Sequence, residues 1–451
     1  MTDSRAPGLL TAIYDLGWYA PTFNIFEFLA GALIWERTHG FRATGLVVLK
    51  RLFADSLIFQ PQAPPEYDFR IHDIVLGAAQ LFPLEHVELT RDVAAVAAAA
   101  RESGNGVFPP CWNPRLNRAE LQQHRYYLQG FLRDHQKAGL QVPGIRVPPF
   151  AFKTIRRLIR KLPKPWISVT IRRAHHLTAK NANADVWVQV ARHFERAGAS
   201  VIFIPDIETV EHFSAAGPLA AMAMSNLVYR AALYDACDLN LAVLNGSIAP
   251  FWFNPSAVFA IAKVSTEGTN SSRSNLEALW NLRPGDPFVN QLPWQRIVWS
   301  DDGDAAQIIA EAERLLDYSA RLRRQIGKTP LVSDPWGKPD GSVRGIWDAS
   351  APGTSEPKFE RELESRLSSA GWAVTMKEAS PFSCKPLILD AEELLARRDF
   401  EGALTAARRA IRADGRYPRA YQIAAECLSQ GGQVQLAQKY AAAAGSLLKS
   451  S

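Results

Sequence analysis

The stretch that decides the fold reads Trp166-Ile-Ser-Val-Thr-Ile-Arg-Arg173, an apolar and β-branched run that ends in paired arginines. Such a run is typical of a strand buried on both faces of a sheet, with its polar residues where the chain leaves the sheet. A polar loop follows, and residues 186–197 then carry apolar side chains at helical spacing. Strand, loop and helix in this order predict a parallel α/β layer.

The same unit recurs further along the chain. Residues 200–205 form a second predicted strand, which leads into the carboxylate of Asp206. Residues 239–244 form a third strand, which ends in Asn245-Gly246-Ser247 and leads at once into a predicted helix. We therefore expect a doubly wound parallel sheet whose strand ends carry polar side chains.

Ligands of such sheets bind at the carboxyl ends of the strands. Arg172 and Arg173 offer planar forks for phosphate oxygens, and a Gly246-Ser247 turn that opens a helix offers backbone N–H groups to the same anion. Together they predict a site for the pyrophosphate of a nucleotide or nucleotide sugar. The alternative is that the arginines pair with surface carboxylates and that Asn245 only caps a helix.

Composition narrows the class of protein. The chain has 451 residues, a net charge of +6 and a pI near 9.1, which is too weakly basic to indicate nucleic-acid binding by itself. No signal peptide is evident, and the first apolar stretch is interrupted by Glu27 and Glu36. The cysteines are scattered without CxxC spacing, at Cys111, Cys237, Cys384 and Cys427. We expect a cytoplasmic protein, at most peripheral to the inner membrane.

A further α/β layer precedes the first motif. We expect strands at residues 9–14, 45–50, 86–90 and 106–111. We expect helices at residues 21–35, 67–82, 91–103 and 118–136. We therefore expect an N-terminal α/β domain at residues 1–145 and a second at 146–325. A linker rich in Pro, Gly and Ser occupies residues 326–380, and helices occupy 381–451.

Two charged segments each allow two interpretations. The helix predicted near residues 153–164 has a basic face, which either contacts an anionic lipid surface or acceptor or is solvated between the domains. Its basic residues are Lys153, Arg156, Arg157, Arg160 and Lys161. The run Asp301-Asp-Gly-Asp304 either holds a divalent metal or, as we favour, caps the helix that follows.

The C-terminal region repeats itself. Several similar residues recur 34 positions apart, and the matched pairs are Glu392 and Glu426, Leu394 and Leu428, Phe400 and Val434, Ala403 and Ala437, Ala407 and Ala441, and Ala410 and Ala444. Paired helices with this period and small contact residues are typical of tetratricopeptide repeats. We expect this all-α region to dock on the rest of the chain or on a partner protein.

These motifs resemble those of glycosyltransferases with the GT-B fold, which has two Rossmann-like domains. Ser168 to Arg173 is similar to the strand motif of GDP-fucose-dependent fucosyltransferases, in which the second arginine holds the donor pyrophosphate, and residues 241–247 resemble their Asn-Gly turn. Lys180 and Trp187 resemble a loop lysine and helix tryptophan of heptosyltransferases, whose catalytic base matches the place of Asp15.

The resemblance implies an inverting, metal-independent transfer of a sugar from a donor such as GDP-fucose or ADP-heptose to a glycan, lipid-linked or protein acceptor, with no cofactor. Arg172, Arg173, Lys180 and Asn245 to Ser247 would bind the diphosphate, and Asp15, with Glu27 in reserve, would be the base. Asp206 and Tyr229 are the candidates for nucleoside contact. The alternative is a non-catalytic scaffold whose repeats recruit a partner. A nucleic-acid ligand is disfavoured because the basic helix has no aromatic interleaving.

Overall fold

The computed structural model describes part of the chain. It comprises residues 8–51, 70–103, 106–115, 129–140, 142–172, 178–204, 220, 222–224, 226–269, 271–289, 291–299, 302–326, 385–413 and 417–448.

The N-terminal half forms a 4-stranded parallel sheet in the order β3-β2-β1-β4. Its strands are β1 (Leu9–Asp15), β2 (Ala43–Leu49), β3 (His86–Thr90) and β4 (Val107–Phe108). Strand β1 is central and almost fully buried, because its apolar residues are covered on both faces. The strand order reverses between β1 and β4, so the loop after β1 lies where doubly wound sheets bind ligands.

Helices cover this first sheet. They are α1 (Ile25–His39), the short helix η1 (Ile71–Val75), α3 (Leu76–Ala79), α4 (Val93–Glu102) and α6 (Gln129–Lys137). Helix α1 is buried on all sides from Ile25 to Ile34, which explains its continuous apolar sequence. Within the described residues, no helix combines the length and the hydropathy needed to cross a bilayer.

The second half forms a 5-stranded parallel sheet in the order β6-β5-β7-β8-β9. Its strands are β5 (Trp166–Thr170), β6 (Ser200–Ile204), β7 (Leu239–Val243), β8 (Phe259–Ala262) and β9 (Gln295–Ile297). In order of sequence this arrangement is 2-1-3-4-5, one of the two common doubly wound orders. The predicted α/β class with parallel sheets is therefore confirmed.

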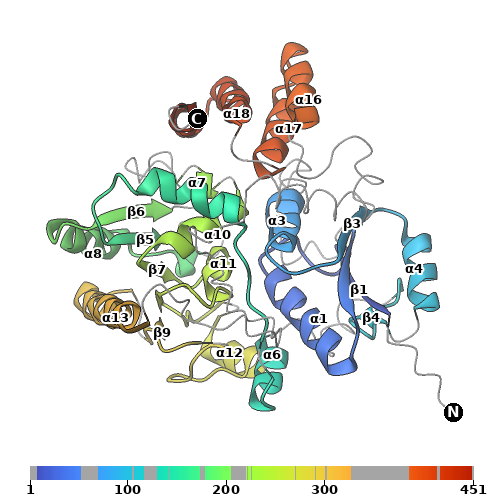
Figure 1. Ribbon diagram of the computed structural model, residues 1–451, viewed down its shortest axis with the longest axis horizontal. Coiled ribbons are helices and arrows are strands. Elements are labelled where there is room, and N and C mark those ends of the chain that lie inside the picture. Colours follow the sequence, from blue (N-terminus) through green and yellow to red (C-terminus); the bar gives the residue numbers. More distant parts are fainter. Residues whose placement is uncertain are drawn as a thin grey trace.

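Helices lie on both faces of the second sheet (Figure 1). They are α7 (Pro149–Ile159), α8 (Ala184–Arg196), α10 (Leu227–Ala236), α11 (Ala249–Trp252) and α13 (Ala305–Ile326), while α12 (Arg273–Trp280) lies beside α6. Ile167 and Val169 pack in one core with α8 and α13. Thr170, on the opposite face of β5, bonds Tyr234 of α10. Because successive side chains of β5 point to opposite faces of the sheet, α8 and α13 cover one face and α10 covers the other.

The two sheets are joined through aromatic and small residues. The ring centroids of Phe26 in α1 and Phe253 lie 5.9 Å apart. A Cβ atom added at Gly246 would lie 2.8 Å from Cδ2 of Phe23. Arg133 of α6 donates to the carbonyl oxygen of Pro287 at 2.7 Å. The loop after β1 therefore touches the loop after β7, and the carboxyl ends of the two sheets face each other.

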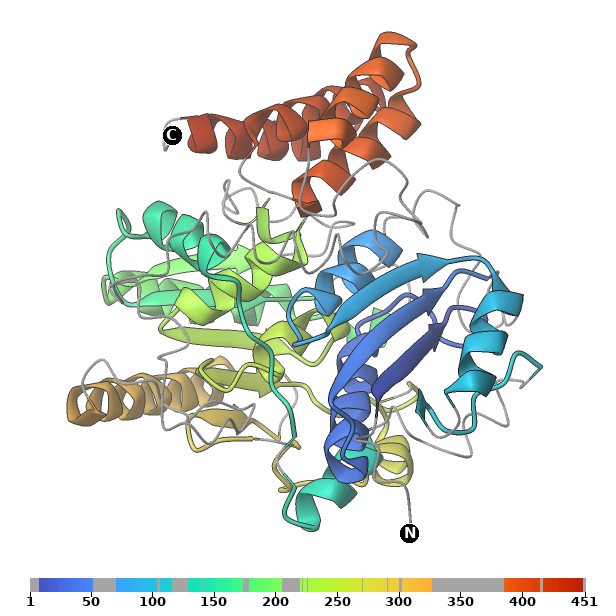
Figure 2. The ribbon, with the colours of Figure 1, turned by 45° about the vertical axis from the view of Figure 1, so that its right-hand side comes forward.

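Two helical hairpins form the C-terminal region, at the top of Figure 2. They consist of α16 (Lys385–Ala396) with α17 (Phe400–Ala413), and α18 (Pro418–Gln430) with α19 (Val434–Leu448). Phe400 and Val434, a predicted repeat pair, both open the second helix of a hairpin. Ala403 and Ala437 are both buried at helix contacts. The paired helices agree with the repeat pattern, while membership of the tetratricopeptide family stays a prediction.

Several sequence expectations need correction. Strand β8 and helix α12 were not predicted, because Phe259–Ala262 is a short apolar run without alternation after an aromatic segment. Helix α1 begins at Ile25 rather than near Pro21, and the strand expected at residues 106–111 covers only Val107–Phe108. Parts of the helices expected at residues 67–82 and 118–136 lie outside the described residues.

Candidate functional site

The ends of β5 and β7 are adjacent at one edge of the second sheet. Thr170 pairs with Ala242, so Arg172 and Asn245 both lie just beyond that edge. The strand order reverses here, because β6 lies on one side of β5 and β7 on the other. The structure therefore brings Arg172 and the 245–247 turn together at the topological switch point.

The 245–247 turn is organised by Asn245. Its Oδ1 accepts from the Ser247 backbone N–H at 2.8 Å and from the Ser247 hydroxyl, and its Nδ2 donates to the Val243 carbonyl. The helix that follows is short, with one 3₁₀ turn at Gly246–Ile248 (η5) leading into α11. The Ser247 N–H thus already has an acceptor, and Asn245 acts as the cap that was the alternative interpretation.

Cationic side chains gather around Asn181 at the same edge. Arg172 donates through Nη1 to Asn181 Oδ1 at 2.6 Å, and Lys263 donates through Nζ to the Asn181 carbonyl at 2.7 Å. Lys180 is next in the chain to Asn181 and half-buried. We call Arg172, Lys180 and Lys263 the cation cluster.

The Arg172 charge acts on Lys180. Burial, and to a smaller extent the positive charge of Arg172, lower the pKa of Lys180 to about 8. Like charges held together in a half-buried position favour an anion between them, because the anion stabilises the charged forms. The cation cluster therefore has the electrostatics of an anion site.

Asp302 is a carboxylate at this edge. It is buried, pairs with Lys263 at 3.0 Å, and accepts from the Asn183 N–H at 2.5 Å and from Trp187 Nε1 at 3.2 Å. Asp302 thus holds Lys263 and the start of α8 in place. The ion pair with Asp302 neutralises the charge of Lys263.

The acidic run before α13 has the helix-capping role that we favoured. Asp304 Oδ1 accepts from the N–H groups of Ala306 and Gln307 at 2.9 and 3.3 Å. Within the described residues, no group of three or more histidine, cysteine, aspartate or glutamate side chains is placed to hold a metal ion.

Asp15 ends β1 and is fully buried, with 0% of its surface exposed. Its Oδ1 accepts from the Gly17 N–H at 2.8 Å and from Arg51 Nε at 2.9 Å, and its Oδ2 accepts from Trp112 Nε1 at 3.3 Å. Burial raises the Asp15 pKa, and these partners oppose the rise. Asp15 therefore organises the loop after β1, and an acceptor hydroxyl would reach it only by displacing the long Trp112 contact.

The reserve base, Glu27, lies in the first turn of α1 and is buried. It accepts from Gln129 Nε2 at 3.1 Å, and burial raises its pKa to about 8. Near neutral pH this carboxyl is mostly protonated, so it is a poor acceptor of protons there.

Of the two candidates for nucleoside contact, the structure describes Tyr229. Tyr229 is buried and packs edge-on against Phe150, with 6.3 Å between the ring centroids. Its backbone N–H donates to the side chain of Asn226, which caps the start of α10. The structure thus places Tyr229 in the core beneath α7. Arg173 and Asp206 lie outside the described residues.

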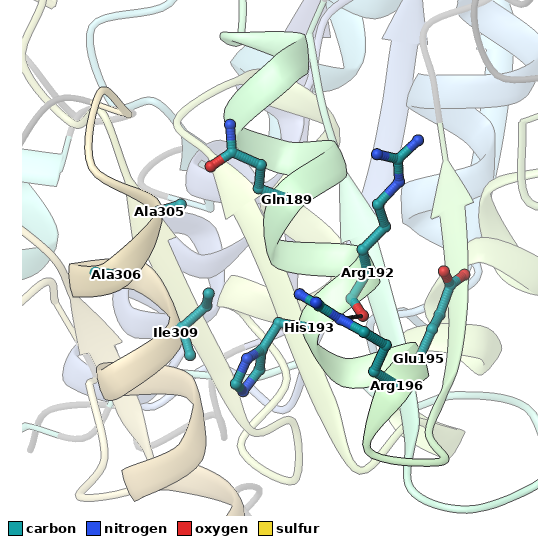
Figure 3. A pocket seen from close by; sticks show the side chains of 8 residues that line it. All are labelled: Gln189, Arg192, His193, Glu195, Arg196, Ala305, Ala306 and Ile309. Carbon is teal, nitrogen blue, oxygen red and sulfur yellow. Dashed lines mark hydrogen bonds between the residues drawn. The ribbon is translucent and has the colours of Figure 1, made fainter.

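A separate groove lies between α8 and α13 (Figure 3). Its lining residues are Gln189, Arg192, His193, Glu195, Arg196, Ala305, Ala306 and Ile309. His193 bridges the two helices through Glu313 at 2.7 Å. The groove shares no residue with the cation cluster and contains none of the predicted site residues.

Lys263 and Asn181 were missed by the sequence interpretation. Lys263 directly follows the unpredicted strand β8, with a left-handed φ of 50° that turns the chain after the strand. A lysine just after an apolar run was the available signal, and recognising β8 would have placed Lys263 at the same edge of the sheet as Arg172, with β7 between them. Asn181 gave no signal, because its role depends on contacts with distant residues.

Comparison with known proteins adds little beyond this geometry. No protein-family model matches the sequence, and no curated protein matches it. Among solved structures, the chain is similar to the crystal structure of the glycosyl transferase family 9 from Veillonella parvula DSM 2008. The identity is 12% and the TM-score 0.35, over 69% of this chain and 97% of that one. We therefore infer function from the residues of this chain.

The Lys180 pKa predicts how ligand binding depends on pH. A diphosphate interacts best with the ammonium form, so affinity should fall as the pH rises through about 8, where the free Lys180 loses its proton. Calorimetric titration with nucleoside diphosphates between about pH 7.5 and 9.5 measures this, and a variant at Lys180 is needed because the pKa of Glu27 is also about 8. Lys180→Arg stays charged and should flatten the profile; an unchanged slope in that variant would exclude Lys180 as the titrating group.

Proposed function

We propose that the protein is a GT-B glycosyltransferase that uses a nucleoside-diphosphate sugar. The observation that carries the proposal is the cation cluster at the topological switch point of the second sheet, opposite the loop after β1. Arg172 and Lys180 there are near enough for one charge to lower the pKa of the other. A diphosphate is an anion whose charge and size suit such a group.

The proposed reaction is a direct, inverting displacement. The acceptor oxygen forms a bond to the anomeric carbon, while the bond from that carbon to the diphosphate oxygen breaks and its electron pair leaves with the nucleoside diphosphate. Arg172 and Lys180 stabilise the charge on the leaving group, a role that a metal has elsewhere. The proposed enzyme therefore needs neither a metal nor another cofactor. Arg173 belongs to this set by its place next to Arg172 in the sequence.

Asp15 is proposed as the base that takes the acceptor proton. Its raised pKa suits that role, because a carboxylate of higher pKa is a stronger base. Its position at the end of β1 lies across from the 245–247 turn, which Phe23 of the same loop touches. Proton transfer requires the 3.3 Å Trp112 contact to open and admit the acceptor.

A thermal-shift screen tests the function. GDP, ADP and UDP and their sugars are added to the full chain, and a ligand at about 100 times its dissociation constant should add roughly 2.7 kcal/mol to the stability. Release of nucleoside diphosphate from the sugar that stabilises best then reports turnover. Stabilisation by none of these compounds would argue against the proposal.

The acceptor is proposed to be a glycan, a lipid-linked saccharide or a protein, and a lipid-linked acceptor suits the basic helix α7. The apolar face of α7, which includes Phe150, Ile155 and Ile159, is buried, while Arg157, Arg160 and Lys161 are exposed. A helix that buries its apolar face in the protein cannot insert in a bilayer, so contact with lipid would be electrostatic. We propose a cytoplasmic protein that touches the inner membrane through this face.

Vesicle sedimentation tests this contact. Arg157, Arg160 and Lys161 changed together to alanine should reduce binding to anionic vesicles about 100-fold, because each cation near the surface contributes about 1 kcal/mol. The matched control replaces Arg91, Arg101 and Lys137, which are exposed on the other half of the molecule. Equal loss in both variants, or no loss in the first, would contradict a specific role of α7.

A second candidate function concerns the C-terminal helices α16 to α19, which we call the tail. The large apolar side chains that are exposed within the described residues, Tyr417, Val434 and Leu448, all belong to it. Exposed apolar side chains mark a protein-binding surface where they form a contiguous patch. A scaffold whose repeats recruit a partner is therefore the alternative, and a chain that binds a partner but no nucleotide sugar would favour it over the enzyme.

A further inference from the structure

The N-terminus of α10 is the point where three parts of the molecule meet. Asn226, which precedes the helix, is 1% exposed. It contacts the tail, and its neighbour Leu227 contacts the first α/β unit. Helix α10 packs on the second sheet. Its first turn therefore contacts the α/β units of both sheets and the tail.

One side chain caps two helices at this point. The Oδ1 atom of Asn226 accepts from the Tyr229 N–H at 3.0 Å, which caps the start of α10. Its Nδ2 donates to the Ile411 carbonyl at 2.5 Å, and Ile411 lies in the last turn of α17. Carbonyl groups of a last turn lack partners within their own helix. Asn226 therefore completes one helix of the body and one helix of the tail.

The adjacent contacts hold the first α/β unit to the same turn. The Leu227 N–H donates to Asp73 Oδ1 of η1 at 3.3 Å. Gly77 packs so closely on Leu227 that an added Cβ would lie 3.1 Å from the Leu227 Cβ. Helix α17 also packs on η1. A displacement of the tail would therefore disturb the start of α10 directly.

The other face of α10 reaches the proposed diphosphate site. The Tyr234 hydroxyl lies 2.8 Å from Thr170 Oγ1, at the end of β5, and donates to the Ser247 carbonyl at 3.4 Å. Thr170 leads to Arg172, and Ser247 belongs to the turn that Asn245 organises. Tyr234 is thus the contact between α10 and both strand ends of the site.

Helix α10 can transmit a displacement between these ends. All residues from Leu227 to Tyr234 are buried, and Arg230 is fastened by a bond from Nε to the Ala223 carbonyl at 2.7 Å. A buried, close-packed helix moves as a unit, because its neighbours leave little room for local adjustment. Leu227, at the start of α10, and Tyr234 are separated by about two helical turns.

We propose that the tail is a positioning element of the site, coupled through Asn226, α10 and Tyr234 to the ends of β5 and β7. The effect on diphosphate binding rests on the proposed function. The mechanical coupling between the tail and the strand ends does not depend on it. A protein bound to the tail would act on the site along the same route. The tail is then a regulatory input to the body.

Asn226→Asp in the full chain tests the coupling. Aspartate keeps the size of the side chain and the cap on α10 but turns the amide donor into an oxygen that repels the Ile411 carbonyl. Asn226→Ser removes the same donor without adding a charge and also keeps a cap. Hydrogen exchange is followed in the last turn of α17 and in residues 244–248, and the affinity for the best nucleoside diphosphate is measured by calorimetry.

We expect exchange in both segments to become about five-fold faster and the dissociation constant to rise by about the same factor, the lower end of ordinary coupling between sites. Faster exchange in α17 alone would overturn the coupling. Unchanged exchange in α17 would overturn the docking role of Asn226.

Tyr234→Phe supplies the second arm of a double-mutant cycle. It removes the hydroxyl that contacts Thr170 and Ser247 without touching the tail. If α10 transmits the effect, Asn226→Asp should add little to exchange at residues 244–248 once Tyr234 is phenylalanine. Full additivity would contradict the route through Tyr234. Because exchange needs no nucleotide, a wild-type chain that binds none would refute the proposed function and leave the coupling measurable.

Discussion

Replacing Arg172 and Lys180 together by alanine should weaken the binding of a nucleoside diphosphate about a thousand-fold. Each residue is proposed to make a charge-assisted bond to the diphosphate, and each such bond is worth roughly 2 kcal/mol. The loss should appear in calorimetric titrations of the full chain at about pH 7, where Lys180 is mostly charged. Folding should change little, because both side chains are half-buried and water can replace Arg172 on Asn181.

The matched control is Arg192→Ala. Arg192 is an exposed arginine of α8, in the groove of Figure 3 and outside the cation cluster. The Arg192→Ala variant should bind the diphosphate with the same affinity as the wild type. If Arg192→Ala weakened binding and the double variant did not, the ligand would belong to that groove and the proposed site would be wrong.

The second large effect is expected at Asp15. Asp15→Ala removes the carboxylate that pairs with Arg51 and accepts from Gly17 and Trp112, so those donors lose their acceptor in a buried place. Breaking a buried pair in this way costs roughly 3 kcal/mol, and chemical denaturation should show that loss. Arg51 remains 24% exposed, which keeps the expected cost at the low end of the range.

Asp15→Asn separates the structural role from the catalytic one. Asparagine keeps the size and one acceptor oxygen, so the expected loss of stability is about 1 kcal/mol. It cannot take a proton, and sugar transfer should fall about a thousand-fold while diphosphate binding persists. An Asp15→Asn variant that transfers sugar at the wild-type rate would leave Asp15 with a structural role only.

Much of the fold could be predicted from local patterns. The β-branched run at 166–171 and the apolar run at 239–244 appear as β5 and β7, adjacent and parallel. The 34-residue spacing appears as two hairpins. These features depend on residues near each other in the chain, and periodicity records them directly.

The site was less predictable because its contacts join residues distant in sequence. Lys263 reaches Asn181 across β7, and Asp302 holds Lys263 and Trp187 at once. The position of Gly246 under Phe23, a residue of the first half, follows from the packing of the sheets and not from the Asn-Gly-Ser motif. Local sequence showed where strands end, but not which side chains meet there.

The most direct test of the central claim is residue-by-residue protection of lysines from acetylation at about pH 8, read by mass spectrometry with and without saturating nucleoside diphosphate. Lys180, with its lowered pKa, should react readily in the free protein because much of it is uncharged there. We predict that the ligand slows Lys180 about ten-fold or more while the exposed Lys161 reacts as before. Equal reactivity of Lys180 with and without a ligand that demonstrably binds would contradict a diphosphate site at the cation cluster.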